Sequence, residues 1–155
     1  MITKAFFISL AIGLFSTTVM AQDATSRQKE YNLDNNVAIS GYDPVAYFKL
    51  NKAVKGKKEL ALNQQGVTYY FSTVANREEF RKNPMQYEPE YGGWCAYAMG
   101  AKGQKVTIDP ETFKIINGKL YLFYNSYFNN TLKSWNKDET NLKGKADTNW
   151  KKIFH

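Results

Sequence analysis

The sequence predicts an α+β fold, in which antiparallel hairpins carry helices packed on one face of a compact single domain. Two glycine-marked turns, at Gly66 and at Asn117-Gly118, each separate runs rich in β-favouring residues. Apolar residues then recur at helical spacing toward the C-terminus. Hairpins and helices that each bury one face assemble into α+β architectures.

The N-terminal part carries weaker local signals. Residues 22–36 are polar and predict a flexible lead-in, and residues 37–39 form a short apolar run. Residues 41–44 predict a turn, because they combine glycine with Asp-Pro. Residues 45–50 are expected to form a short strand or a single helical turn.

A hairpin and a helix follow. Residues 59–63 and 67–72 predict two paired strands. Thr73 is a suitable N-cap for a helix over residues 74–82, since its hydroxyl can accept from the first free backbone N–H groups. The helix is expected to end at Asn83, because a residue before proline avoids the α region.

The C-terminal part carries the strongest local signal. Residues 113–116 and 119–124 predict a hairpin, whose Asn-Gly turn supplies both positive-φ residues of a type I′ turn. Two further helices are expected from i, i+4, i+7 or i+8 stripes of apolar residues. The stripes are Phe128, Leu132 and Trp135, and then Leu142, Ala146 and Trp150.

The first 21 residues are predicted to be a signal peptide. Lys4 precedes an apolar run at residues 5–15, and small or modest side chains lead to a cleavage point before Gln22. The run is shorter than the roughly 20 residues of a membrane span, although an uncleaved anchor is the alternative. We therefore expect an exported protein, periplasmic or extracellular, with its domain over residues 37–155 and no transmembrane span after cleavage.

The chain carries a formal net charge of +7, which favours anionic surfaces. Nucleic acid is not expected as a partner of an exported protein. Five lysines gather in one segment, which predicts a solvated loop or, as the alternative, a patch for an anion or a membrane surface. They are Lys49, Lys52, Lys55, Lys57 and Lys58.

Cysteine and histidine are scarce. Cys95 is the single cysteine and His155 the single histidine, so neither an intramolecular disulfide nor a four-ligand zinc site can form from Cys and His. Stability must come from the core, for which 11 Tyr, 10 Phe and 3 Trp offer large apolar areas.

Two motifs in the middle of the chain resemble the YHS domain family. The family's Asp-Pro-Val-Cys is matched by DPVA at residues 43–46. Its motif of an aromatic residue, then Phe-Cys-Ser-x-x-Cys-Arg-x-x-Phe, is matched by YFSTVANREEF at residues 70–80. An exported subfamily is similar over nearly the whole domain, through GYDPVAYF at residues 41–48 and YGGWCAY at residues 91–97.

The resemblance implies a small metal-handling module with thiolate ligands. The three cysteine positions of the family fall on Ala46, Ser72 and Asn76 in this chain. Alanine has no donor atom, and neutral hydroxyl and amide groups are poor ligands for thiolate-binding metals. The metal site is therefore not expected here.

Cys95 leaves three alternatives open. A free cysteine is commonly buried and inert. Met99 follows at i+4, so thiolate and thioether could instead share a helix face and bind copper, or haem, with a tyrosine oxygen as a further ligand. A redox or intermolecular thiol is the third alternative. No cofactor is the main expectation.

A non-catalytic role is the main expectation, and an enzyme of unrecognised type is the third hypothesis. A cysteine nucleophile requires a base, and the only histidine, His155, ends the chain. The carboxylates with the most suggestive placement, Asp43, Glu88, Glu90 and Asp109, adjoin prolines or the same bend and fit solvated turns.

We therefore expect an exported, non-catalytic binding module for a small ligand or an envelope protein, with the copper or haem carrier as the alternative. Tyrosines around two glycine-marked segments could line a pocket for a flat or apolar ligand, although they could equally form core. The site is expected where residues 41–47 meet residues 91–99. Its candidate ligand-binding residues are Tyr42, Asp43, Tyr47, Tyr91, Trp94 and Tyr97, with Cys95 and Met99 as candidate metal ligands.

Overall fold

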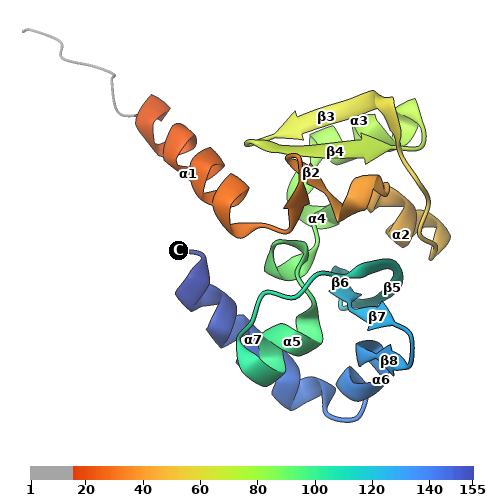
Figure 1. Cartoon of the computed structure of the whole chain (residues 1–155). Coiled ribbons are helices and arrows are strands. Elements are labelled where there is room, and N and C mark those ends of the chain that lie inside the picture. Colours follow the sequence, from red (N-terminus) through yellow and green to blue (C-terminus); the bar gives the residue numbers. More distant parts are fainter. Residues whose placement is uncertain (1–15) are drawn as a thin grey trace, which may run out of the picture.

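The computed structural model describes residues 16–155, and their side chains from residue 23 onward (Figure 1). Its helices are α1 (Ser16–Glu30), α2 (Pro44–Leu50), α3 (Val74–Lys82), α4 (Pro84–Tyr87), α5 (Ala96–Lys102), α6 (Thr131–Trp135) and α7 (Glu139–Ile153), with short 3₁₀ turns η1 (Ile39–Gly41) and η2 (Glu90–Gly93). Its strands are β1 (Leu33–Asp34), β2 (Val37–Ala38), β3 (Lys57–Gln64), β4 (Val67–Phe71), β5 (Asp109–Ile116), β6 (Lys119–Phe123), β7 (Asn125–Ser126) and β8 (Asn129–Asn130). The predicted α+β class is confirmed.

The strands form three small sheets. The largest has the order β1-β2-β4-β3, in which β2 and β4 run parallel and the other neighbours antiparallel. The hairpins β5–β6 and β7–β8 form the other two sheets. In Figure 1 the β3–β4 hairpin lies at the top with α3, and α5, α6 and α7 lie at the bottom.

Both predicted hairpin turns are confirmed. Gln65 and Gly66 join β3 to β4 with φ of 47° and 83°, and Asn117 and Gly118 join β5 to β6 with φ of 50° and 72°. Two consecutive positive-φ residues match the right-handed twist of a hairpin. The predicted helix at residues 74–82 is also confirmed, and Thr73 caps it by accepting from the backbone N–H of Asn76 at 3.1 Å.

Strand β6 separates two apolar cores. Leu120 and Leu122 point into the first core, which β4, α2 and α3 complete. Tyr121 and Phe123 point into the second, which α5, α6 and α7 complete. Successive strand residues face opposite sides, so a strand covered on both faces buries all of them. The shared strand joins the two halves into one unit.

The N-terminal segment differs from the expected loose lead-in. Helix α1 occupies it as far as Glu30 and is held against the body of the protein. Arg27 is almost fully buried and forms an ion pair with Glu88, which also accepts from the Tyr69 hydroxyl at 2.9 Å. The indole Nε1 of Trp94 donates to the Glu30 carbonyl at 2.7 Å. Polar composition alone did not indicate these tertiary contacts.

One predicted helix is shorter than its stripe suggested. Helix α6 begins only at Thr131, and Phe128 lies fully exposed in the β7–β8 turn rather than on the helix. The side chain of Asn130 caps α6 by accepting from Leu132 N at 3.1 Å, which fixes the start of the helix beyond Phe128. The last predicted helix is confirmed as α7, with Leu142 and Ala146 buried.

The apolar run of the predicted signal peptide, residues 5–15, lies outside the described residues. Helix α1 extends across the expected cleavage point before Gln22. Within residues 16–155, none of the helices combines the length and the apolar character that crossing a bilayer requires.

Candidate functional site

A buried carboxylate lies where the two YHS-like motifs meet. Asp43 is fully buried and caps α2, its Oδ1 accepting from the backbone N–H groups of Val45 at 2.9 Å and Ala46 at 3.3 Å. Its Oδ2 accepts from Ser72 N at 2.8 Å, from Ser72 Oγ at 2.6 Å and from Asn76 Nδ2 at 2.8 Å. We call Asp43, Ala46, Ser72 and Asn76 the Asp43 cluster.

Local rules explain how each member reaches the cluster. Pro44 occupies the first turn of α2, where its missing N–H costs nothing, so the preceding Asp43 takes the cap position. Ser72 directly follows β4, and Asn76 lies in the first turn of α3. Sheet and helices therefore bring together the three positions at which the resemblance would place cysteines.

The cluster does not fit the metal that the resemblance implies. Ala46 contributes only its backbone N–H, and the hydroxyl of Ser72 and the amide nitrogen of Asn76 both donate to Asp43. Both carboxylate oxygens are already surrounded by donors, which repel a cation. Across residues 16–155 no group of three or more Cys, His, Asp or Glu side chains is arranged to hold a metal ion.

Cys95 lies at the N-terminal boundary of α5 and is fully buried. Its Sγ accepts from the backbone N–H of Tyr124 at 3.3 Å and lies 3.4 Å from Thr131 Oγ1. The Thr131 hydroxyl donates its single proton to the Tyr124 carbonyl at 2.7 Å. Thr131 Oγ1 is therefore left as an acceptor, and the S–H of Cys95 is the donor between them. This arrangement satisfies both the donor and the acceptor capacity of the thiol.

A cleft opens beside this thiol. It has a volume of about 240 Å³, and apolar groups of Tyr97, Ala98, Ala101, Val106 and Tyr124 dominate its lining. Polar groups of Cys95, Lys102, Gln104, Asn129 and Thr131 complete it. We call it the Cys95 cleft.

Three segments build the Cys95 cleft. Helix α5 supplies part of the lining and is capped after Lys102 by Gly103, whose φ of 63° turns the chain back. The returning segment is held there by a hydrogen bond from Cys95 N to the Val106 carbonyl of 2.9 Å. Tyr124, Asn129 of β8 and Thr131 at the start of α6 form the third part of the lining, and Thr131 is held there by its bonds to Tyr124 O.

The two candidate metal ligands lie in different surroundings. The side chain of Met99 packs in the second core against residues such as Tyr91 and Trp135. The thiol of Cys95 faces Tyr124 and Thr131 instead. Their helical spacing therefore places them on one element, but Met99 does not line the Cys95 cleft.

The structure separates the other predicted ligand-binding residues. Tyr47 is buried in the first core, where its hydroxyl donates to the Pro110 carbonyl at 2.8 Å. Tyr42 is half-buried against the same core. Trp94 packs against the second core, so residues 41–47 and residues 91–99 do not form the shared pocket that we expected. Tyr97 is the predicted ligand-binding residue that lines the Cys95 cleft.

Tyr91 lies at a second cavity, of about 410 Å³, together with Tyr121, Lys143 and Trp150. Its hydroxyl donates to Asp147 at 2.8 Å, and Lys143 donates to the other oxygen of Asp147 at 2.8 Å. Burial, and then the hydrogen bond to Asp147, raise the pKa of Tyr91 far above the ordinary value of a phenol. Burial also raises the pKa of Tyr47 far above that value. Both side chains are neutral donors rather than phenolate ligands.

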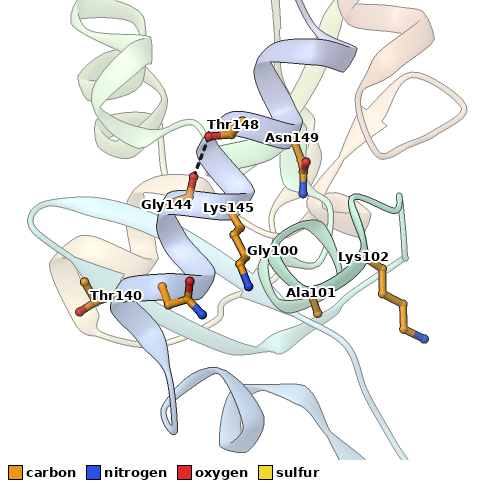
Figure 2. A pocket seen from close by; sticks show the side chains of 9 residues that line it. Gly100, Ala101, Lys102, Thr140, Gly144, Lys145, Thr148 and Asn149 are labelled. Carbon is orange, nitrogen blue, oxygen red and sulfur yellow. Dashed lines mark hydrogen bonds between the residues drawn. The ribbon is translucent and has the colours of Figure 1, made fainter.

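A shallow polar groove lies on the other side of α5 (Figure 2). Residues of α5 and α7 line it, among them Gly100, Ala101 and Lys102 of α5 and Gly144, Lys145 and Thr148 of α7, and both lysines are exposed. An added Cβ at Gly100 would lie 2.4 Å from the Leu142 carbonyl oxygen, so this glycine permits the close approach of the two helices. The groove shares Ala101 and Lys102 with the rim of the Cys95 cleft.

Sequence reasoning missed most residues of the Cys95 cleft. Ala101, Val106, Tyr124 and Thr131 come from three segments that only tertiary packing brings together. The YGGWCAY block pointed to the right helix, but no spacing links it to Thr131. From the sequence, Thr131 could be interpreted only as a residue at the start of a helix, and nothing indicated that it would line a cleft.

Comparisons with protein-family models, curated proteins and solved structures gave no match to this chain.

Proposed function

We propose that the chain is an exported, non-catalytic module of the YHS type that binds a small, largely apolar ligand in the Cys95 cleft. The observation that carries this proposal is the cleft itself, which is mainly apolar and has a few polar groups in its lining. Ligand sites commonly combine these two features.

The cleft defines the class of ligand. Its volume of about 240 Å³ is below the range of pockets for drug-sized molecules and suits a single or fused ring. Tyr97 and Val106 offer apolar contact, and Thr131 and Asn129 offer hydrogen bonds. Lys102 at the rim favours a ligand with an anionic or strongly polar substituent over a cationic one.

The Asp43 cluster supports the YHS type. The resemblance requires the positions of Ala46, Ser72 and Asn76 to share one site, although Ala46 lies far in sequence from the other two. All three contact the Asp43 carboxylate. If hydrogen bonds have replaced the metal site of the family, the three positions should still lie close together although they no longer bind a metal.

The non-catalytic character is supported by the state of the thiol. Cys95 donates to Thr131 and faces no histidine, because His155 lies exposed at the C-terminus. A cysteine nucleophile acts as the thiolate and requires a base within hydrogen-bond distance.

The experiment is an NMR titration of the full chain with three small aromatic probes: indole, phenol and benzoate. Saturable shifts are expected for the amides of Ala101, Val106 and Tyr124. The variant Ala101→Phe fills the rim and is expected to abolish them. Ala75→Phe is the matched control, since Ala75 is also an exposed helical alanine but lies on α3. Shifts that are absent from the cleft, or that survive Ala101→Phe, would contradict the proposal.

The alternative that the sequence offers is a copper or haem carrier that uses Cys95 and Met99, although the structure places these two side chains in different surroundings. Metal analysis and an absorption spectrum of the purified protein and of Cys95→Ser distinguish it. One equivalent of copper, or a Soret band, that is lost in the variant would support the carrier and contradict the proposed ligand site.

A further inference from the structure

We propose that the segment from Lys49 to Lys58 docks the protein on an anionic lipid surface. The segment connects the end of α2 to the start of β3 and follows one edge of the molecule (Figure 1). This surface is independent of the Cys95 cleft.

Charge is concentrated on this segment. Between Asp43 and Glu59 the chain has no acidic residue. It has five exposed lysines there, against a net charge of +7 for the whole chain. They are Lys49, Lys52, Lys55, Lys57 and Lys58, and we call them, together with Leu50, the basic edge.

These lysines lack carboxylate partners. In the part of the chain that the structure describes, none of the five forms a salt bridge, whereas Lys105, Lys114 and Lys143 each pair with a carboxylate. The Lys55 ammonium lies 5.7 Å from the ring centre of Tyr42, which leaves its charge unneutralised. The positive potential of the basic edge is therefore directed outward.

The backbone gives the basic edge a defined shape. Asp43 N donates to the Val54 carbonyl at 2.8 Å, and Gly56 N donates to the Gly41 carbonyl at 2.9 Å. A Cβ at Gly56 would lie 2.4 Å from the Tyr70 carbonyl carbon, so the segment packs directly on β4. The lysine side chains consequently extend from a fixed edge.

Two features favour a lipid surface over other anionic partners. All five cations are lysines, which act as hydrated point charges, whereas arginine is preferred for the bidentate recognition of individual phosphates or carboxylates. Leu50 lies among them with 62 % of its surface exposed. An apolar side chain surrounded by lysines can enter the headgroup region while the ammonium groups remain at the anionic surface.

The test is cosedimentation of the full chain with phosphatidylcholine vesicles, with and without phosphatidylglycerol. Binding is expected only to the anionic vesicles and is expected to weaken as salt shortens the Debye length from about 10 Å at 0.1 M to about 3 Å at 1 M. Each lysine near such a surface contributes about a fivefold factor, so Lys49→Gln, Lys52→Gln and Lys57→Gln together should weaken binding by about 100-fold. Leu50→Asn should weaken it by about tenfold.

The matched control is the triple variant Lys133→Gln, Lys137→Gln and Lys152→Gln, which removes the same charge from exposed lysines elsewhere. It is expected to bind within a few-fold of the unmodified chain. Equal losses in both triple variants would contradict the proposal, because net charge alone would then explain binding. Binding to neutral vesicles, or to duplex DNA or polyglutamate in preference to anionic vesicles, would also contradict it. Circular dichroism of each variant verifies that it is folded.

Discussion

Removal of the Asp43 carboxylate is expected to destabilise the protein strongly. Asp43 is fully buried and accepts five hydrogen bonds from Val45, Ala46, Ser72 and Asn76. Each buried donor that loses its acceptor costs about 1–3 kcal/mol, and these costs are not additive. We therefore expect Asp43→Ala to lower the free energy of unfolding by about 4 kcal/mol, a large part of the about 5–15 kcal/mol of a typical domain.

Urea unfolding, followed by tryptophan fluorescence, measures this loss. With a slope of about 2 kcal/mol/M, the midpoint should fall by about 2 M. Asp43→Asn keeps the volume and one acceptor, so it should lose less and provides a measurable variant if Asp43→Ala does not fold. The control is Asp138→Ala at the exposed start of α7, which should lose less than about 1 kcal/mol. A loss at Asp43 no larger than at Asp138 would refute the assignment of a stabilising cluster.

A double-mutant cycle tests the same contact directly. Asn76→Ala alone removes one donor to Asp43. If the two side chains act together, the combined loss should differ from the sum of the single losses by at least about 1 kcal/mol. Additive losses would show that Asn76 stabilises the protein through capping or packing of α3 alone.

Three further perturbations have defined outcomes in unfolding assays. Gly100→Ala should lower the free energy of unfolding by about 2–3 kcal/mol, because the added Cβ meets the Leu142 carbonyl. Gly144→Ala, whose Cβ faces open space on α7, should raise it by about 0.5–1 kcal/mol. Equal effects would contradict the close packing of α5 on α7. Burial raises the pKa of Tyr31 to about 12, above the unfolded value near 10, so the folded state holds this proton more tightly. Its contribution to stability should be complete below pH 10 and should fall as the pH rises from about 10 to 12, and Tyr31→Phe should reduce that fall; an unchanged pH profile would contradict the burial. Phe128→Ser should change the free energy of unfolding by less than about 0.5 kcal/mol, because Phe128 is exposed, whereas Trp135→Ala should lower it by about 3–5 kcal/mol, because Trp135 is buried. Similar losses would indicate that Phe128 packs on the same helix face as Trp135.

Local chemistry explains which elements the sequence could predict. The Asn117-Gly118 turn and the Thr73 cap act on residues next to them, so their elements form where the sequence indicates. The stripe that includes Phe128 was misleading, because periodicity does not show where a helix begins. The helix begins only after its cap at Asn130, and the positive φ of Tyr127 excludes a regular helix at the preceding turn. Phe128 therefore lies outside the helix.

The candidate sites depended more on tertiary structure. The expected pocket between residues 41–47 and 91–99 assumed that two glycine-marked aromatic segments would meet. Strand β6 lies between the two cores instead, and each segment packs on its own side. The sequence did not predict that Ser72 and Asn76 meet at Asp43, since no helical or strand period links residue 43 to residue 72. The expected solvated turn at Asp43 was wrong, because this carboxylate is fully buried.

A crystal structure of the full chain with indole tests the proposed function most directly. The predicted result is electron density for the ring in the Cys95 cleft, between Tyr97 and Val106 and beside the thiol. Indole bound only at other surfaces, or a metal ion bound to Cys95 Sγ, would contradict the proposed ligand site.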